Sequence, residues 1–572
     1  MLKIIRNPVY YILIIFLLFL ISGVSATAPL AEFTADTQSG SVPLTISFTD
    51  LSSNSPTGWA WFFGDETYDQ PWTQMTAGAG WSTRGLASCV VTPSGSIILM
   101  GGGWEYNGLT NDVWMSKDYG TTWTRMVEHA GWSARSHHTS VVMLDGSIVL
   151  MGGRDGSGAY LNDVWRSTDN GVTWTRMAEH AGWSARFCPT SVVLSDGSIV
   201  VMGGIGSDDR KNDVWRSTDN GATWRLMTEH AGWSPRYTQS SVAMPDDSIV
   251  LMGGNDRNPI NDVWRSVDKG VTWTLVNASA GWSGRNCPIS VVMPDESIVL
   301  MGGYGGTLMN DVWRSTDSGS TWVQVKTVAE WSGRYGHNAV AMPDGSIVLL
   351  GGVFGYSTGN PSNYKNDVWR LRPAGSSEQN PSHTYTFPGS YSVALQVYNT
   401  VGYNSIQEAG YITVSSRTEE NQSTGILVTK TISPKFLKQG TDARITVTVL
   451  NQEPDPIHDI EIVDSTQPEF PVLDGITQFT TQSIESNGTR ILSYTIHAIK
   501  PGSFRLNRTA VMYADQDGNY HMAYSNYEKV EVLPSLIPPT PQNGAEIVIR
   551  DFLDWLNGLG YRNAQLKQVD PS

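Results

Sequence analysis

The stretch GWSARFCPTSVVLSDGSIVVMGG, residues 182–204, is followed by NDVWRSTDNGATWRLM, residues 212–227. The first stretch contains two short apolar runs, TSVVL and SIVVMGG, separated by the turn residues Ser195, Asp196 and Gly197, a pattern that is typical of a β-hairpin. The second contains two more strand patterns, NDVWRS and ATWRLM, on either side of another glycine turn. Together they predict a unit of four short antiparallel strands.

This unit is repeated along the chain. NDVW occurs six times, at spacings of 51, 50, 49, 49 and 56 residues. A period near 50 residues indicates a repeat architecture, and four antiparallel strands per repeat are one blade of a β-propeller. The six repeats therefore predict six blades. The aspartates of NDVW are Asp112, Asp163, Asp213, Asp262, Asp311 and Asp367, and the tryptophans of the preceding GWS or EWS motif are Trp81, Trp132, Trp183, Trp233, Trp282 and Trp331.

The two ends of the repeat region complement each other. PWTQM, residues 71–75, matches the fourth strand of a unit but precedes the first full unit, and the last NDVWRL, residues 366–371, is followed by no such strand. We expect the segment at Trp72 to supply the outer strand of the sixth blade. This would close the ring and remove its open edge.

The repeats resemble two known families. The Gly-Gly pair after an apolar strand, the later Trp and the Trp-x-x-Arg before the next strand resemble Kelch repeats over residues 66–377. The Ser-x-Asp-x-Gly-x-x-Trp turns resemble the Asp-box of sialidase-like propellers, in which Asp caps the turn, Gly adopts a positive φ and Trp packs on the sheet. These turns are residues 116–123, 167–174, 217–224, 266–273 and 315–322.

Another domain is interrupted by the repeats. In GWAWFFGD, residues 58–65, Trp59, Trp61 and Phe63 alternate and should point to one face of a strand, but no partner strand follows. A matching strand pattern appears only in the segment that begins at Asn380. The two segments resemble the halves of a PKD domain, a small Ig-like sandwich, although Glu66 stands where that family has Gly. The resemblance implies that the propeller occupies a loop, which is possible because its two ends lie close together.

The expected fold is all-β: a six-bladed β-propeller inserted into an Ig-like (PKD) β-sandwich, plus a second Ig-like β-sandwich and a short C-terminal helix. The second sandwich follows from alternating strands punctuated by Pro, Gly and Asn, and it resembles adhesion-type modules of prokaryotic cell-surface proteins. The predicted boundaries are a signal peptide at 1–26, the two PKD halves at 29–66 and 379–416, the propeller at 67–378, a linker at 417–423, the second sandwich at 424–533 and a Pro-rich spacer with an amphipathic helix at 534–572.

The N-terminus predicts export. Lys3 and Arg6 precede an apolar run over residues 9–21, and small residues follow, as in a cleavable signal peptide. The alternative is a membrane anchor over residues 9–26. We therefore expect a secreted or envelope-associated protein that contacts a membrane only through an uncleaved N-terminal segment. The net charge of −16 excludes the basic footprint of a nucleic-acid-binding protein.

Six arginines follow the Trp of each repeat, and two interpretations of them remain open. Each Arg could brace its own blade by stacking on Trp and bonding nearby carbonyls. Alternatively, the six could form a ring of cations around the channel mouth that contributes to ligand binding. These residues are Arg84, Arg135, Arg186, Arg236, Arg285 and Arg334.

The connections between the second and third strands differ most among the repeats, and they share a face with the connections between blades. Variable loops on a repeated scaffold favour a binding site, although drift in exposed loops would look the same. Exposed aromatic residues suit sugar faces and protein hot spots, so we expect a protein or carbohydrate ligand. The candidate binding aromatics are Trp104, Tyr106, Tyr160, Tyr304, Phe354 and Tyr356, with Tyr364 nearby.

Catalysis requires unlike groups gathered in one pocket, and the sequence offers no such set. The alternative function is a sialidase-like or other glycan-active propeller enzyme. Unlike metal ligands are also few, because His137, His138, His337, Cys188 and Cys287 lie on blades that are not all adjacent. We therefore predict no catalytic residue, no metal and no cofactor, and three cysteines that cannot build a disulfide framework.

Overall fold

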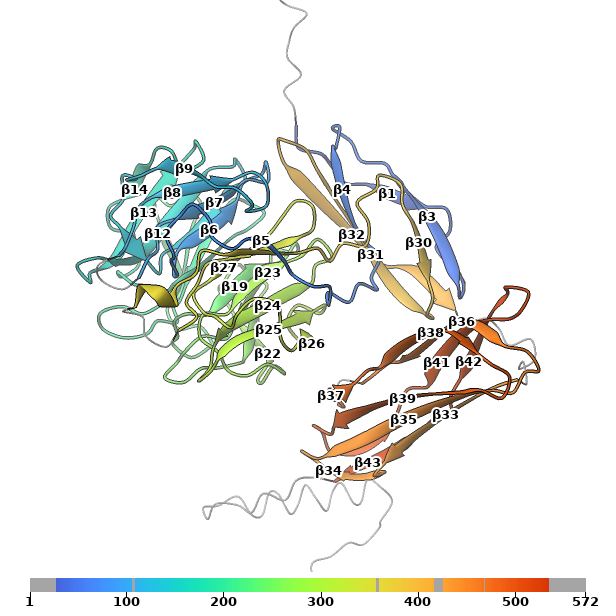
Figure 1. Cartoon of the computed structure of the whole chain (residues 1–572). Helices are drawn as coiled ribbons and strands as arrows, with labels where there is room; N and C mark the ends of the chain where they lie inside the picture. Colours follow the sequence, from blue (N-terminus) through green and yellow to red (C-terminus); the bar gives the residue numbers. More distant parts are fainter. Residues whose placement is uncertain (1–26, 105–107, 356–359, 416–424, 468, 534–572) are drawn as a thin grey trace, which may run out of the picture. The chain divides into compact units, whose positions relative to one another are not determined.

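The computed structural model of the chain describes residues 27–104, 108–355, 360–415, 425–467 and 469–533 (Figure 1). The expected signal peptide, the linker at 417–423 and the C-terminal helix lie outside these residues. The described part is all-β, as predicted, and its one helical element is the short 3₁₀ helix η1 at Pro361–Asn363. Among the described residues, no helix is both long and apolar enough to cross a bilayer.

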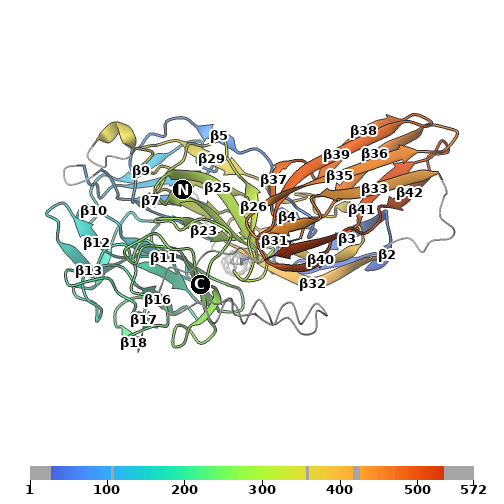
Figure 2. The ribbon, with the colours of Figure 1, turned by 90° about the horizontal axis from the view of Figure 1, so that it is seen from below.

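Six sheets form the blades of the propeller (Figure 2). Each blade has four antiparallel strands; in the first five blades they follow the order of the chain, and the second blade carries one additional short strand. The first blade has β6 (Ser88–Val91), β7 (Ile97–Met100), β8 (Val113–Ser116) and β9 (Thr124–Val127), and the second has β10 (Arg135–Ser136), β11 (Thr139–Val142), β12 (Ile148–Asp155), β13 (Tyr160–Ser167) and β14 (Thr175–Ala178). The third has β15 (Thr190–Val193), β16 (Ile199–Met202), β17 (Val214–Ser217) and β18 (Arg225–Thr228), and the fourth has β19 (Ser240–Ala243), β20 (Ile249–Met252), β21 (Val263–Ser266) and β22 (Thr274–Asn277). The fifth has β23 (Ile289–Val292), β24 (Ile298–Tyr304), β25 (Leu308–Ser315) and β26 (Val323–Lys326), and the sixth has β27 (Asn338–Ala341), β28 (Ile347–Leu350), β29 (Val368–Leu371) and β5 (Thr73–Thr76).

The blades close into a ring. Each innermost strand contacts the innermost strand of the next blade, in the order β6, β11, β15, β19, β23 and β27, and β27 contacts β6 again. The sixth blade is completed by β5, which pairs antiparallel with β29 although the two strands lie at opposite ends of the repeat region. The prediction that the segment at Trp72 closes the ring is therefore confirmed.

Apolar packing between neighbouring blades holds the ring together. The first four residues of the second strand are buried in every blade, so this part of the strand faces neighbours on both sides. Around the third blade, Val149 and Val164 of the second blade pack with Trp183 and Ile199. Trp183 is 1% exposed, and its counterparts in the other five blades are at most 1% exposed. Burial of these large side chains contributes roughly 1.5–3 kcal/mol each relative to exposure.

The strands that flank the propeller in sequence pair with each other. One sheet has the order β1-β3-β30 and the other has the order β2-β32-β31-β4. In the second of these, Trp61 of β4 lies opposite Leu395 of β31. These strands, here called the first sandwich, are β1 (Phe33–Ala35), β2 (Ser39–Ser41), β3 (Leu44–Asp50), β4 (Gly58–Phe62), β30 (Ser382–Tyr385), β31 (Gly389–Tyr398) and β32 (Tyr403–Ser415).

Strand β4 is buried on both faces. On one face Trp61 packs against Phe33 and Phe48 of the first sandwich, with ring centroids 5.4 and 5.6 Å apart. On the other face Ala60 and Phe62, both fully buried, join a core cluster that includes residues of the fifth and sixth blades. The alternating aromatics predicted only the first face, although the unbroken apolar run GWAWFF is also the pattern of a strand buried on both sides.

Polar contacts to the turns of the fifth and sixth blades come from the first sandwich and from Tyr68, which lies in the segment that follows β4. The Tyr68 hydroxyl donates to Asp295 Oδ2 at 2.9 Å, and Arg314 pairs with the same carboxylate at 2.5 Å while its guanidinium lies 4.1 Å from the Tyr68 ring centroid. The side-chain amide of Gln396 donates to the carbonyl oxygens of Met342 and Pro343. The first sandwich therefore covers part of the face that carries the short β-turns of the blades.

Glu66 closes the turn that redirects the chain into the propeller. Its carboxylate accepts hydrogen bonds from the backbone N–H groups of Phe63 and Gly64, at 2.5 and 3.0 Å. Burial raises the pKa of Glu66 to about 7, against the lowering effect of the Phe63 hydrogen bond. Glu66 thus satisfies two backbone donors at the point where the chain leaves β4 for the propeller.

A pair of glycine substitutions tests this packing. Gly345 and Gly146 occupy equivalent turns with φ of +71° and +79°, so alanine at either position meets the same backbone penalty of about 1–2 kcal/mol. A Cβ at Gly345 would also lie 2.9 Å from Phe62 Cζ and 3.1 Å from Ala60 Cβ, whereas one at Gly146 would meet only Pro93, at 3.5 Å. We expect Gly345→Ala to lower the unfolding midpoint more than Gly146→Ala. Equal shifts in thermal unfolding would contradict the packing of β4 on the propeller.

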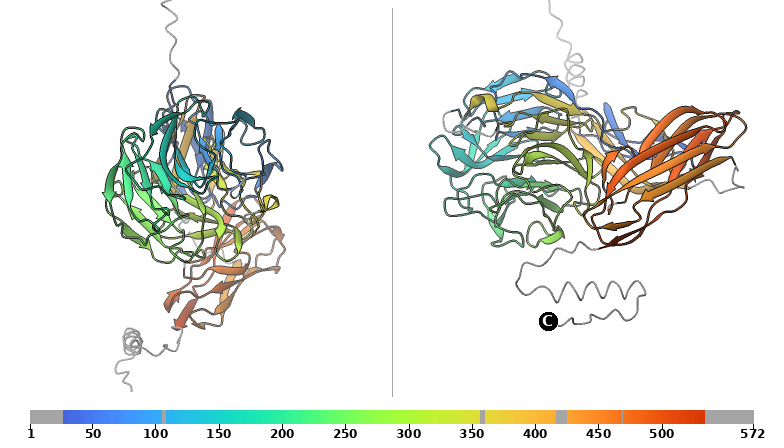
Figure 3. Two further views of the ribbon diagram at one scale, coloured as in Figure 1. Left: turned by 90° about the vertical axis from the view of Figure 1, so that its left-hand side faces the viewer. Right: turned by 60° about the horizontal axis from the view of Figure 1, so that its bottom comes forward.

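The C-terminal strands form a separate β domain, the second sandwich (orange to red in Figure 3). Its sheets have the orders β33-β35-β39-β37, β38-β36-β41-β42 and β34-β43-β40, around a core that includes Val447, Ile462 and Val511. The strands are β33 (Ile426–Ser433), β34 (Phe436–Lys438), β35 (Asp442–Asn451), β36 (Ile457–Asp464), β37 (Val472–Gly475), β38 (Gln478–Ile484), β39 (Thr489–His497), β40 (Gly502–Arg505), β41 (Thr509–Ala514), β42 (Tyr520–Tyr524) and β43 (Lys529–Leu533).

Candidate functional site

The base of the variable-loop face is built from a repeated Arg–Asp pair. In the third blade, Arg186 donates to both carboxylate oxygens of Asp213, at 2.5 and 2.8 Å, and to the carbonyl oxygen of Gly203 at 3.0 Å. Trp215 donates from Nε1 to the same carboxylate at 2.8 Å. Burial alone would raise the pKa of Asp213, but the hydrogen bond and charge of Arg186 outweigh it and hold the pKa below its usual value. The pair fixes the Gly-Gly segment from which the loop starts.

All six arginines make this pair, and none is accessible to a ligand. Their exposed fractions are 0–2%, and each guanidinium lies 5.6–6.0 Å from the ring centroid of the Trp of its own motif. The expectation that they form a cation ring at the channel mouth is therefore wrong. Their charges are matched within the blades, as an unpaired charge is too costly to bury. The pairs are Arg84–Asp112, Arg135–Asp163, Arg186–Asp213, Arg236–Asp262, Arg285–Asp311 and Arg334–Asp367.

Each blade contributes one residue of left-handed backbone just before its innermost strand, with φ between 46° and 58°. Backbone hydrogen bonds join these residues at four of the six junctions between blades: for example, the N–H of His137 donates to Leu86 O, and the N–H of Cys188 donates to His137 O, both at 2.9 Å. The ring that they form, here called the mouth ring, therefore lies around the entrance to the channel. Its members are Leu86, His137, Cys188, Thr238, Cys287 and Gly336.

Aromatic side chains gather beside the mouth ring. The Phe187 ring lies 5.0 Å from the Tyr160 ring and 6.0 Å from the Tyr237 ring, measured between centroids, and 5.2 Å from His137. All of these side chains are only half-buried. We call Tyr160, Phe187 and Tyr237 the aromatic cluster. It joins one predicted residue, Tyr160, to two that the sequence analysis did not single out.

Two guanidinium groups lie over the aromatic cluster. Arg154 is 6.0 Å from the Tyr160 ring centroid, and Arg210 is 5.5 Å from the Tyr237 ring centroid. Burial raises the pKa of Tyr237, so its hydroxyl stays protonated and can donate a hydrogen bond. The surface thus combines apolar rings, a hydroxyl and cationic groups, which are the features of a protein-binding hot spot.

The other predicted aromatics have different environments. Tyr304 of the fifth blade pairs with Tyr335, which precedes the first strand of the sixth blade, at 6.0 Å between centroids, and Lys365 Nζ lies 3.9 Å from the Phe354 ring centroid. Trp104 is half-buried at its loop. Tyr364 is only 2% exposed, so its expected role as an exposed loop aromatic is wrong. Tyr106 and Tyr356 lie outside the described residues.

Isolated β-bridges hold Phe187 and Tyr237, which the sequence analysis did not single out, against the variable loops. Phe187 pairs with Ile205, and Tyr237 pairs with Asn255, so the residue after each Arg lies against the variable loop of its own blade. The position directly after Arg changes from blade to blade although Arg itself never does. That contrast was visible in the sequence as Gly85, Ser136, Phe187, Tyr237, Asn286 and Tyr335.

The ionisable groups of the mouth ring are electrically neutral at neutral pH. Burial lowers the pKa of His137 to about 4 and raises the pKa of Cys287 to about 12; it also raises the pKa of Cys188. A protonated thiol is a poor nucleophile and a poor metal ligand. Within the part of the chain that the structure describes, no group of three His, Cys, Asp or Glu side chains could hold a metal ion.

A belt of hydroxyl groups lines the innermost strands beyond the mouth ring. Thr139 and Ser191 are joined at 2.6 Å between hydroxyl oxygens, Thr190 and Ser241 at 2.6 Å, and Ser240 and Ser290 also at 2.6 Å. Ser88 and Ser140 form the corresponding pair between the first two blades. Each bond links neighbouring blades, so these polar residues serve the ring itself.

The buried histidines predict a pH dependence of stability. His138 is 6% exposed, and burial, with the charge of Arg135, lowers its pKa to about 3. As the pH falls below about 6.5 the unfolded chain binds a proton at this site and the folded chain does not, so stability is lost between about pH 6.5 and 3. At pH 5 the loss is about 2 kcal/mol.

His138→Gln should remove this contribution, because Gln239 occupies the equivalent position in the fourth blade and donates to the Met202 carbonyl oxygen. We expect the free energy of unfolding of the parent to fall by about 2 kcal/mol relative to this variant between pH 7 and pH 5. His337→Gln should repeat the result, since burial lowers the pKa of His337 to about 3 as well. Parallel pH curves from chemical unfolding would contradict the neutral, buried state of these side chains.

Comparison with known families agrees with the two kinds of β domain. Residues 85–303 match a family model described as the KLHDC2/KLHL20/DRC7 Kelch-repeats domain. Residues 410–535, which include the second sandwich, match a model described as translocon-associated protein beta (TRAPB). No curated protein shows a match to the chain. The Kelch resemblance of the repeats is thus confirmed: the chain contains a Kelch-repeat domain with the architecture of a β-propeller.

Proposed function

We propose that this chain is an exported binding protein that captures a protein partner on the variable-loop face of its Kelch-repeat propeller. The observation that carries the proposal is the contrast between neighbouring positions. The invariant Arg of each blade is buried and paired, whereas the next residue varies and, in the third and fourth blades, supplies the half-buried rings of Phe187 and Tyr237. Packing of the blade does not require these rings.

The opposite face is less suited to a partner. It repeats similar short turns, and the first sandwich and the segment that follows β4 cover part of it through contacts such as Gln396–Met342 and Tyr68–Asp295. Binding residues are found mainly on loops held by a rigid scaffold, and here the variable loops rest on the Arg–Asp pairs. Kelch domains generally mediate protein interactions, which supports a protein rather than a small molecule as the partner.

The finer assignments belong to the same proposal. We propose that the first sandwich is a PKD-type domain and that the Ser-x-Asp-x-Gly-x-x-Trp turns are Asp-boxes. In the third blade Asp219 accepts hydrogen bonds from the backbone and side chain of Thr223, and Trp224 donates to the Gly221 carbonyl oxygen, which supports a structural role for the turn. A secreted or cell-surface location rests on the N-terminal sequence pattern. Adhesion would be one use of such a protein.

A comparative capture experiment tests the proposal. The full chain, a Tyr160→Ala/Tyr237→Ala variant and a Leu144→Ala/Val267→Ala control are immobilised and exposed to cell-surface extracts and to a glycan array. Leu144 and Val267 are 68% and 75% exposed on the turn face. We expect a protein that is retained by the parent and the control but not by the loop-face variant. If the parent retains a glycan and no protein, the partner is a carbohydrate and the proposal of a protein partner is wrong. If only the Leu144→Ala/Val267→Ala control loses binding, the binding site lies on the turn face.

A further inference from the structure

The interior of the second sandwich contains an ion pair between its two larger sheets. Lys430 lies on β33 and Asp464 ends β36, and their side chains are 2% and 0% exposed. Lys430 Nζ is 2.6 Å from Asp464 Oδ1 and 2.9 Å from the carbonyl oxygen of Asn507. The hydroxyl of Tyr494, on β39, donates to Asp464 Oδ2 at 2.8 Å.

A buried ion pair is a poor way to stabilise a small β domain. The cost of removing two charges from water can exceed their mutual attraction, and apolar residues of similar size often serve as well. The same two groups become useful if they react. An amine and a carboxyl group held in contact inside a protein have a high effective concentration, because the entropy of bringing them together is already lost on folding.

We propose that Lys430 and Asp464 condense to an intramolecular isopeptide bond. The proton shared along the Nζ–Oδ1 hydrogen bond moves to the carboxylate, which leaves a neutral amine and a carboxylic acid. The Nζ lone pair attacks Cγ of Asp464, a C–N bond forms, one C–O bond breaks, and the oxygen leaves as water with one proton from the acid and one from nitrogen. No oxidant, reductant or other co-reactant is required.

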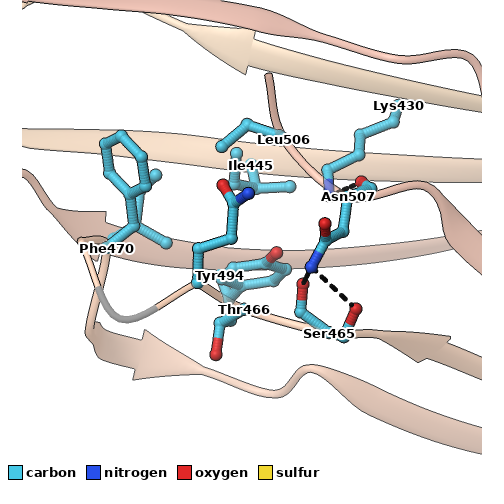
Figure 4. A pocket seen from close by; sticks show the side chains of 10 residues that line it. Lys430, Ile445, Ser465, Thr466, Phe470, Tyr494, Leu506 and Asn507 are labelled. Carbon is cyan, nitrogen blue, oxygen red and sulfur yellow. Dashed lines mark hydrogen bonds between the residues drawn. The ribbon is translucent and has the colours of Figure 1, made fainter. Parts of the chain in front are cut away.

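The surroundings of the pair suit this reaction. Tyr494 holds Oδ2 by a hydrogen bond and can stabilise the negative charge that develops on that oxygen during attack. A cavity of about 10 Å³ adjoins the pair and is lined by Lys430, Tyr494 and Asn507 among others (Figure 4). This is close to the smallest space that accepts one water molecule, so the leaving water has a place to go.

The cross-link would act as a staple. β33 and β36 belong to different sheets, so the bond would join the two layers of the sandwich. A covalent link between residues 430 and 464 restricts the unfolded chain in the way that a disulfide does. All cysteines of the chain lie in the propeller, at Cys89, Cys188 and Cys287, and none is available to this domain. The inference is independent of the proposed binding function.

Mass spectrometry of a tryptic digest of the full chain tests the proposal. Trypsin does not cleave after a Lys whose Nζ is acylated, so we expect a branched peptide in which residues 418–435 are joined to residues 445–490, lighter than the sum of its parts by the mass of one water. Lys430→Arg should yield only linear peptides. Lys435→Arg, at an exposed Lys that pairs with Glu528, should retain the cross-link between residues 430 and 464.

Two results on the parent protein would overturn the inference. One is recovery of a linear peptide that ends at residue 430 and of another that begins at residue 431, because trypsin then cleaves after an unmodified Lys430. The other is a mass deficit of ammonia, which would identify the amide of Asn507 as the reacting group. Tyr494→Phe tests the role of the hydroxyl: we expect the fraction of cross-linked chain in freshly refolded protein to rise at least tenfold more slowly than in the parent, and an unchanged rate would remove Tyr494 from the proposal.

Discussion

Asp213→Ala is expected to lower the free energy of unfolding of the propeller by about 3–5 kcal/mol, because it leaves the Arg186 guanidinium buried without its charge partner. Arg186 is fully buried, and the Asp213 side chain is 16% exposed, so little solvent screening is available to compensate. Chemical unfolding of the full chain, followed by tryptophan fluorescence, measures the change.

The double variant Arg186→Met/Asp213→Leu removes both charges and keeps two large side chains at these positions, so it distinguishes the loss of the ion pair from the presence of one unpaired charge. Replacing a buried ion pair by apolar residues of similar volume is often neutral or stabilising, so we expect it to recover most of the stability lost in Asp213→Ala. If the single variant unfolds at the same denaturant concentration as the parent, Arg186 is not the buried, paired group described above.

Trp183→Ala is expected to destabilise the third blade by about 3–5 kcal/mol, through lost burial and the cavity left behind. The Trp183 ring contacts the neighbouring blade and lies 6.0 Å from the Trp224 ring, so the cavity would open between two blades. Differential scanning calorimetry of the full chain gives the size of the effect.

Val267→Ala is the surface control for this substitution. Its side chain is 75% exposed, and exposed substitutions away from special features change stability by less than about 0.5 kcal/mol. A Trp183→Ala protein as stable as Val267→Ala would show that the recurring Trp is not part of the core.

Repetition made the propeller predictable from sequence. Six copies of one pattern give the strand number, and the unmatched strand at Trp72 gives the closure, because both depend on local alternation and on counting. Positive φ at Gly221 follows from the turn chemistry of its Ser-x-Asp-x-Gly-x-x-Trp motif in the same way.

Contacts between distant residues were not predictable in this way. The Arg186–Asp213 pair joins two recurring motifs that are 27 residues apart, and recurrence alone does not say that they touch. Phe62 looks like part of a one-faced strand until the propeller is placed against it. Tyr364 and Phe354 lie close together in the same connection, yet one is buried and the other is not, because side-chain direction in an irregular loop depends on its tertiary neighbours.

The binding site is the part of the molecule least accessible to sequence reasoning. Tyr160 was predicted from its loop, but Phe187 and Tyr237 belong to the connections between blades, where the invariant Arg attracts attention. Only the structure places the Phe187 ring between the other two, 5.0 Å from Tyr160 and 6.0 Å from Tyr237. Variation beside an invariant position is the signal that would have identified them.

The affinity of a captured partner for loop-face and turn-face variants tests the central claim most directly. By titration calorimetry with the purified partner, we expect Tyr160→Ala/Tyr237→Ala to weaken binding by at least about 2 kcal/mol, a typical hot-spot loss, while Leu144→Ala/Val267→Ala binds as the parent does. Unfolding midpoints of all three proteins confirm that each is folded. Unchanged affinity in the loop-face variant, together with weakened affinity in the turn-face variant, would contradict the account.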